Sequence, residues 1–117
     1  MDFEKLEVWK TATDLAVSVY SHLKELRDYG FKDQITRASL SIPSNIAEGM
    51  TRAGAREKLQ YLSIAKGSCS ELRTQIYIGI KIEYIADETG NDWIDRTRRI
   101  AAMISGLTTK IKRDMAC

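Results

Sequence analysis

Apolar residues recur at intervals of three and four along nearly the whole chain, which is the spacing of one face of an α-helix. Four such segments predict helices over residues 5–26, 33–51, 55–84 and 91–114. Hardly any segment alternates apolar and polar residues with the period of two that a half-buried strand requires. Because short connections join the segments, neighbouring helices should be antiparallel. The pattern predicts one all-α domain over residues 1–117, an antiparallel up-down-up-down four-helix bundle.

Each predicted helix has one apolar stripe that should face the core. The four stripes are Trp9, Ala12, Ala16, Val19, Leu23 and Leu26; Ile35, Ala38, Ile42, Ile46 and Met50; Leu62, Ala65, Cys69, Leu72, Ile76 and Gly79; and Trp93, Thr97, Ile100, Ile104, Leu107 and Ile111. We expect Gly30 to close the first helix in the left-handed conformation and Asp33 to cap the start of the second. A loop is expected over residues 86–90.

Pro43 lies inside the second predicted helix and is the only proline of the chain. A proline within a helix removes one backbone hydrogen bond and clashes with the carbonyl four residues earlier, here that of Ser39. Ser41, Ser44 and Asn45 surround the break and can bond the freed backbone groups. The sequence therefore predicts a second helix that is kinked at Pro43 and continues beyond it.

The second helix also carries a polar stripe, roughly opposite its apolar face, with Asn45 to one side. The stripe residues are Arg37, Ser41, Ser44 and Glu48. Two interpretations remain open. These side chains either repair the broken helix and face solvent, or they form a polar contact surface for a partner chain or nucleic acid.

The third helix has a second stripe about 120° around from its core stripe. Its residues are Tyr61, Ile64, Ser68, Glu71, Gln75, Ile78 and Ile82. One apolar stripe is enough for a helix in a monomeric bundle, so a second one predicts a subunit interface. A wide core-facing arc is the alternative. A ring requires a different opposing surface, for which the kinked second helix is the candidate.

Basic residues are concentrated towards the C-terminal end, although the net charge is only +2. Arg96, Arg99, Lys110 and Arg113 share one stripe of the fourth helix, which can follow a phosphate backbone or simply face solvent. Aromatic residues are not interleaved with this stripe, which argues against sequence-specific recognition of single strands. RNA or DNA is therefore a predicted partner without a predicted sequence preference.

Catalytic and metal-binding patterns are absent from the sequence. The one histidine, His22, lies at the edge of the first apolar arc, and a satisfied or surface histidine explains it. Glu-x-x-His pairs, zinc-type spacing and phosphate-binding glycine loops do not occur. We predict no enzyme activity, no cofactor and no metal. Two cysteines, no secretion signal and no apolar run long enough for a bilayer predict a cytoplasmic protein that is not inserted in a membrane.

With these residues in view, the chain resembles the four-helix bundle family encoded by intervening sequences within bacterial 23S rRNA genes. The resemblance covers nearly the whole length, and its most specific part is the segment of residues 41–49. Its residues are Phe3, Leu6, Val8, Trp9, Ala12, Gln34, Ile35, Arg37, Ala38, the run Ser41-Ile42-Pro43-Ser44-Asn45-Ile46-Ala47-Glu48-Gly49, Ala65, Gly67, Ser68, Glu71, Leu72, Thr74 and Gln75.

The resemblance implies an antiparallel four-helix bundle that assembles into a ring of five subunits. The accessory variability protein of diversity-generating retroelements is a more distant relative, a similar ring that binds nucleic acid and a reverse transcriptase. Two functional hypotheses follow. The chain is either a non-enzymatic homo-oligomeric protein, a homopentamer, associated with RNA or DNA as an accessory or scaffold, or a structural adaptor that binds another protein and has no nucleic-acid role.

Overall fold

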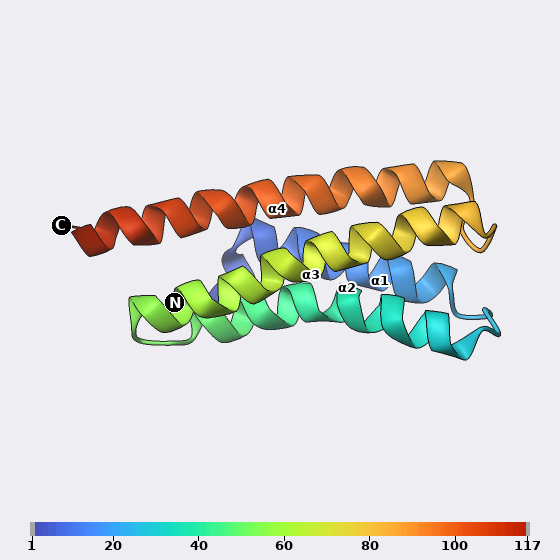
Figure 1. Cartoon of the computed structure of the whole chain (residues 1–117). Helices are drawn as coiled ribbons and strands as arrows, with labels where there is room; N and C mark the ends of the chain where they lie inside the picture. The colour runs from blue at the N-terminus through green and yellow to red at the C-terminus, as the bar shows by residue number, and fades with distance from the viewer. Residues whose placement is uncertain (1, 117) are drawn as a thin grey trace.

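Four antiparallel helices form the structure, a computed structural model that describes residues 2–116. A short 3-10 helix η1 (Phe3–Lys5) precedes α1 (Glu7–His22), α2 (Tyr29–Met50), α3 (Ala55–Lys81) and α4 (Asp87–Ala116). Each helix runs opposite to the one before it (Figure 1). No strand occurs within residues 2–116. The predicted fold class, an up-down-up-down four-helix bundle, is confirmed.

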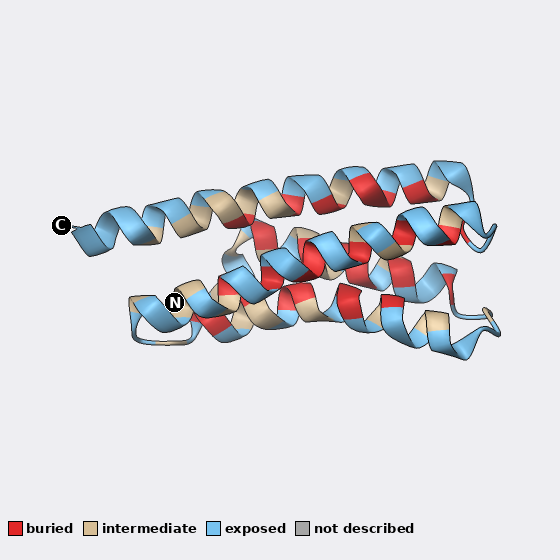
Figure 2. Cartoon of the chain, in the orientation of Figure 1, coloured by how far each residue is buried: buried red, intermediate tan, exposed pale blue. Residues whose placement is uncertain are grey.

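The core lies between the four helices, with α1 and α3 each packed between α2 and α4. Buried residues form a continuous inner stripe along the bundle (Figure 2). Every residue of the stripes predicted for α2 and α3 is buried. In α1, Val8 and Leu15 are buried, whereas Trp9 is half-buried. The core was therefore predictable in the middle of the bundle and less so along α1.

The short first helix explains why the apolar stripe of α4 loses burial towards its end. The α1 helix has 16 residues and α4 has 30, which is about 24 Å against about 45 Å. Trp93 Nε1 donates a hydrogen bond to Ser18 Oγ, so these two residues lie at the same height along the bundle axis. Because the helices are antiparallel, Glu7 is then about level with Ile104. Leu107 and Ile111 lie beyond the reach of α1 and are only half-buried.

The connection between α1 and α2 differs from the prediction. Asp28, and not Asp33, is the N-cap of α2, since its Oδ1 accepts a hydrogen bond from the Phe31 backbone N–H at 3.1 Å. Gly30 is part of the first turn of α2 and has no positive φ. Asp33 lies inside the helix and pairs with Arg37. The helix starts earlier because a capping carboxylate was available ahead of the glycine.

The predicted loop over residues 86–90 is also wrong, because most of it is the first turn of α4. The chain reverses instead around Glu83, which has a positive φ of 66°. The backbone N–H groups of Tyr84 and Ile85 donate to the Gly79 carbonyl and close the end of α3. Gly90 is buried, because the side chains of Ile80 and Ile85 occupy the space that a Cβ would need. Gly90 is therefore a packing residue.

The α2 helix continues without interruption through Pro43, as predicted, and is bowed along its length (Figure 1). Asn45 Nδ2 donates to the Ser41 carbonyl at 2.8 Å and to Ser41 Oγ at 2.9 Å. Ser39 Oγ donates to the Thr36 carbonyl at 2.8 Å. These polar side chains bond the backbone carbonyls of Thr36 and Ser41. Within residues 2–116, none of them is bonded to the Ser39 carbonyl, which is the one that loses its helical N–H partner at Pro43.

Candidate interaction surfaces

An apolar groove of about 420 Å³ runs between α1 and α2, and we call it the α1–α2 groove. Its lining residues are Trp9, Thr13, Ala16, Val17, Tyr20, Ser21, Leu40, Pro43 and Ser44. Val17, Tyr20 and Leu40 are 60%, 44% and 49% exposed, which is high for apolar side chains of this size. The groove is open between the helices because Ala16 and Pro43, two of its lining residues, have small or compact side chains. Sequence reasoning missed this groove, although Val17 and Tyr20 are three residues apart on one helix face.

A second apolar surface lies on the outer side of α3. Ile64, Ile78 and Ile82 are exposed, at 51%, 46% and 46%, and exposed Glu71 lies among them. We call these four residues the α3 stripe. They are the outward part of the stripe that the sequence analysis proposed as a subunit interface.

Of the other three residues of that proposed interface, Ser68 and Tyr61 turn towards α2. Ser68 is buried, and its Oγ lies 2.8 Å from Ser41 Oγ. Tyr61 is half-buried under Arg52, whose guanidinium donates to the Tyr61 hydroxyl at 3.0 Å. Gln75 is half-buried as well. The structure therefore divides the predicted stripe into an outward apolar part and a part that holds α3 against α2.

The polar stripe of α2 is also divided. Ser41 and Asn45 bond each other, and Ser41 continues the network to α3. Arg37 pairs with Asp33 at 3.0 Å, while Ser44 and Glu48 are exposed. Ser41 and Asn45 are therefore engaged within α2 and across to α3, and neither bonds the Ser39 carbonyl. The five residues do not come together as one surface.

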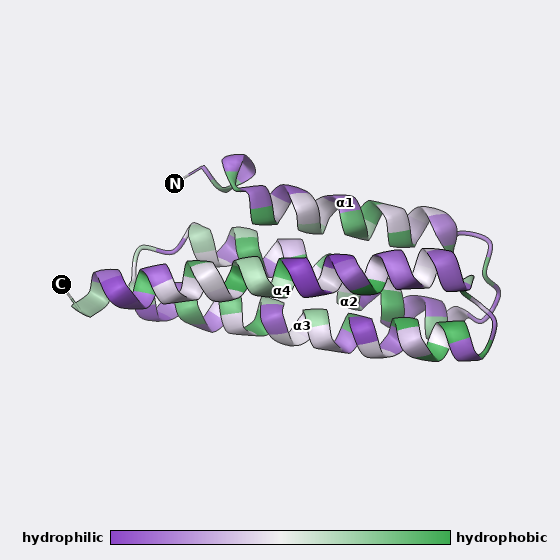
Figure 3. Ribbon diagram, turned by 90° about the horizontal axis from the view of Figure 1, so that it is seen from above, coloured by the Kyte–Doolittle hydropathy of each residue, from purple (hydrophilic) through white to green (hydrophobic). Residues whose placement is uncertain are grey.

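The four basic residues predicted as nucleic-acid contacts lie along α4, and we call them the α4 stripe. Arg99, Lys110 and Arg113 are exposed, and Arg96 pairs with Asp92 at 3.2 Å. The outward side of α4 is largely hydrophilic in the view from above (Figure 3). One of the four charges is thus already engaged within the helix.

A second basic surface lies between α3 and α4, in a groove of about 370 Å³ that we call the α3–α4 groove. Its lining residues are Leu59, Leu62, Ser63, Lys66, Ser105, Thr108, Thr109 and Lys112. No carboxylate is among them. The sequence analysis missed this surface, because it takes one lysine from each of two helices whose relative rotation only the fold fixes.

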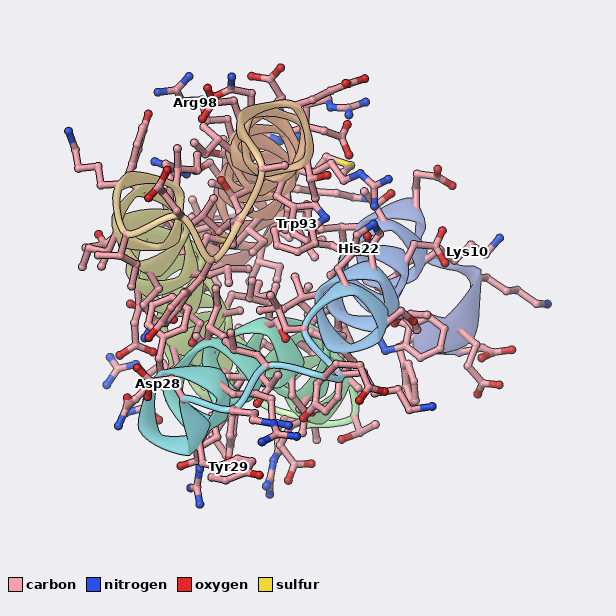
Figure 4. The ribbon with its side chains drawn as sticks, turned by 90° about the vertical axis from the view of Figure 1, so that its right-hand side faces the viewer. Lys10, His22, Asp28, Tyr29, Trp93 and Arg98 are labelled. Atoms are coloured by element: carbon pink, nitrogen blue, oxygen red, sulfur yellow. The ribbon has the colours of Figure 1, made fainter. Side chains whose placement is uncertain are left out.

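His22 and Cys69 are the histidine and the cysteine that the structure describes. His22 is exposed, donates from Nδ1 to the Ser18 carbonyl at 2.9 Å, and places its ring edge-on to Trp93 (Figure 4). Cys69 is buried, and burial raises the pKa of its thiol to about 11. In residues 2–116, no group of three or more His, Cys, Asp or Glu side chains is arranged to hold a metal ion. No helix in this part of the chain is long and apolar enough to cross a membrane.

The chain is similar to a protein family and to solved structures. Residues 4–106 match the family model described as 23S rRNA-intervening sequence protein. The chain is also similar to the crystal structure of a protein of unknown function from the S23 ribosomal protein family of Bacteroides thetaiotaomicron. That likeness has a TM-score of 0.81 at 23% identity and covers 86% of this chain and 97% of the other. At this identity it shows a shared fold. No curated protein matches the chain.

Proposed function

This chain belongs to the 23S rRNA-intervening sequence protein family, and on that premise we propose that it acts without catalysis, as a homo-oligomer associated with nucleic acid. The observation that carries the proposal is the presence of two exposed apolar surfaces, the α1–α2 groove and the α3 stripe, on one small bundle. A ring of five subunits is the assembly that the family resemblance implies.

Two apolar surfaces on different faces are more than a monomeric bundle needs. Soluble monomers rarely leave large contiguous apolar patches exposed, and such patches mark interaction sites. Seen along the bundle, α1 and α3 occupy opposite corners (Figure 4). The α3 stripe of one copy can therefore enter the α1–α2 groove of the next, and the contact can repeat. A contact between unlike surfaces closes into a ring when its rotation allows.

The dimensions of the molecule are sufficient for such an interface. The bundle measures 50 × 21 × 19 Å, so its long sides are extended helical faces. A stable interface buries about 1,000 Å² or more in total, which two such faces can supply. Glu71 lies between the apolar residues of the α3 stripe and would fix the register of neighbouring copies, because an unpaired buried carboxylate is costly.

Light scattering after size exclusion at micromolar concentration tests the assembly. We expect an oligomeric wild type and monomeric, folded Ile78→Asp and Leu40→Asp variants, since each places a charge in one half of the interface. Ala102→Asp, which adds the same charge at an exposed position of α4, is the matched control and should remain oligomeric.

Mixing the two interface variants distinguishes a ring from a symmetric contact. Each variant retains one intact surface, so an equimolar mixture should form dimers and stop there. If α3 instead packed on α3, Leu40→Asp alone would remain oligomeric. A monomeric wild type would overturn the proposed assembly, and an unfolded Ile78→Asp would place Ile78 in the core.

A protein-binding adaptor is the second candidate, and the α1–α2 groove is the feature that favours it. An amphipathic helix of another protein would fit an apolar groove between two helices. This reading requires a monomeric wild type together with no binding of RNA or DNA at low salt.

A further inference from the structure

We propose that the α3–α4 groove holds the phosphate backbone of a nucleic acid, with Lys66 and Lys112 as its principal contacts. The inference rests on the proposed association with nucleic acid and assigns that association to a surface other than the α4 stripe. It also specifies the mode of binding, which is contact with phosphates and not with base edges.

The chemistry of the groove is that of a phosphate site. Lys66 on α3 and Lys112 on α4 both line it, so each of the two helices contributes one lysine side chain. Ser63, Ser105, Thr108 and Thr109 add four hydroxyl groups, and Leu59 and Leu62 provide the apolar part of the lining. Lysine ammonium and serine or threonine hydroxyl groups are common donors to phosphate oxygens. The absence of a carboxylate from the lining means that nothing there repels an anion.

Two arginines extend the positive charge along the same pair of helices. Arg73 of α3 reaches α4, where its Nε donates to Thr97 Oγ1 at 2.9 Å. Arg98 of α4 reaches α3 in the opposite direction and donates to the Tyr77 hydroxyl at 3.2 Å. Each arginine uses one N–H group in these bonds, and each guanidinium has others available for a ligand.

These four basic side chains are not neutralised by the protein itself. None of them forms an ion pair within residues 2–116, where the paired basic residues are Arg37, Arg52 and Arg96. Their field is also felt in the core nearby. Arg73 and Lys66 both act to lower the pKa of the Cys69 thiol, against the larger effect of burial. The α3–α4 seam therefore has four basic side chains without an ion pair in residues 2–116, whereas the α4 stripe includes the Arg96–Asp92 pair.

The spacing fits a backbone. Lys66 and Arg73 are seven residues apart on one helix, a rise of about 10 Å. Phosphates follow one another along one strand of a duplex with an axial rise of about 3.4 Å, so basic side chains at this separation can reach different phosphates of one backbone. Tyr77 is the one aromatic side chain bonded across this seam, and its hydroxyl accepts from Arg98. Contacts of this kind give affinity without sequence preference.

Fluorescence anisotropy with a labelled 20-base-pair RNA duplex, a DNA duplex of the same sequence and the single RNA strand tests the assignment. The variant Lys66→Glu/Lys112→Glu is compared with Arg99→Glu/Lys110→Glu, which reverses the same number of exposed charges on the α4 stripe. We expect the groove variant to lose at least about tenfold in affinity and the control to retain affinity within about threefold. Lys66→Gln/Lys112→Gln should lower the log–log salt slope by about 1.4 to 1.8, the value for two lost phosphate contacts.

Each outcome bears on a separate claim. Wild-type binding that only the α4 variant weakens, or that both variants weaken equally, overturns the groove assignment and leaves nucleic-acid association standing. No wild-type binding to any of the three probes at low salt overturns the association itself. Poly-L-glutamate competing as well as RNA at equal charge would assign the groove to acidic proteins and overturn the inference. Circular dichroism and light scattering confirm that the variants keep the wild-type fold and assembly.

Discussion

Close packing at two glycines fixes the end of the bundle where α3 turns into α4. A Cβ at Gly90 would overlap the Ile80 side chain and lie 3.3 Å from Ile85 Cγ2. At Gly79 it would overlap Ile85 and lie 3.2 Å from Phe31 Cζ. The isoleucines that fill these spaces hold the turn around Glu83 against the helices. By contrast, nothing lies within 4 Å of a Cβ built at Gly67, in the middle of α3.

This difference predicts opposite effects of one substitution at two glycines. Gly90→Ala should destabilise the protein by about 1 to 3 kcal/mol, because the added methyl group overpacks the contact with Ile80. Gly67→Ala should stabilise it by about 0.5 to 1 kcal/mol, since alanine favours a helix and meets no neighbour. Urea unfolding monitored by circular dichroism measures both. A stabilising Gly90→Ala would show that the turn accommodates the methyl group.

A single carboxylate joins two connections at this end of the molecule. Asp28 Oδ1 caps α2, and its Oδ2 accepts a hydrogen bond from the Tyr84 hydroxyl at 2.8 Å. The Phe31 backbone N–H, and then the Tyr84 hydroxyl, lower the pKa of Asp28 below its ordinary value of 3.8. The same carboxylate raises the pKa of Tyr84 above 10.0.

The pH dependence of these bonds has a definite sign. Because the pKa of Asp28 is lower in the folded state, its contribution to stability is present above pH 3.8 and is lost as the pH falls through the folded value. Tyr84 contributes below pH 10.0 and loses that contribution as the pH rises through its raised value. The melting temperature of Asp28→Asn should be below that of the wild type at pH 7, with the gap narrowing below pH 3.8. An equal gap at pH 7 and pH 2.5 would contradict the linkage.

At the scale of the helix, α2 shows what sequence periodicity can and cannot predict. Its apolar stripe from Ile35 to Met50 is buried as predicted, because spacing alone selects the inward face. The predicted start of α2 is wrong, because periodicity does not show which of two aspartates, Asp28 or Asp33, lies where the chain turns into the helix. The α1–α2 and α3–α4 grooves could not be predicted at all. Each combines side chains from two helices, and the rotation of one helix against another is set by packing.

Pro43 offers a test at the same scale. Pro43→Ala restores an N–H that can bond the Ser39 carbonyl, and it should leave the bundle intact. The free energy of unfolding should change by less than about 3 kcal/mol, because the regained bond is offset by lost apolar contacts at a buried position. Chemical denaturation and far-ultraviolet circular dichroism provide the measurement. Loss of helix content in the variant would mean that the bowed shape of α2 is needed for folding.

For the whole molecule, the structure separates apolar from basic surfaces. The α1–α2 groove and the α3 stripe are the apolar faces proposed to join copies, whereas the α3–α4 groove lies beside the α3 stripe and contains no carboxylate. In a ring, every copy would contribute one basic groove, so several weak phosphate contacts would act together. Linked contacts of this kind raise overall affinity without any new contact being made. Assembly and nucleic-acid binding are therefore coupled in the proposal, although separate variants test them.

The position of Cys69 allows the opening of the bundle to be followed by the rate at which a thiol reagent modifies this residue. The thiol is fully buried in the core, and its pKa of about 11 leaves about one part in a thousand as reactive thiolate at pH 8. A thiol reagent can therefore modify it at an appreciable rate only during the brief intervals when the helices separate. The rate at which Cys69 is modified therefore reports how often the helices separate. Any ligand or neighbouring copy that binds the closed form lowers this rate, and a tighter binder lowers it more.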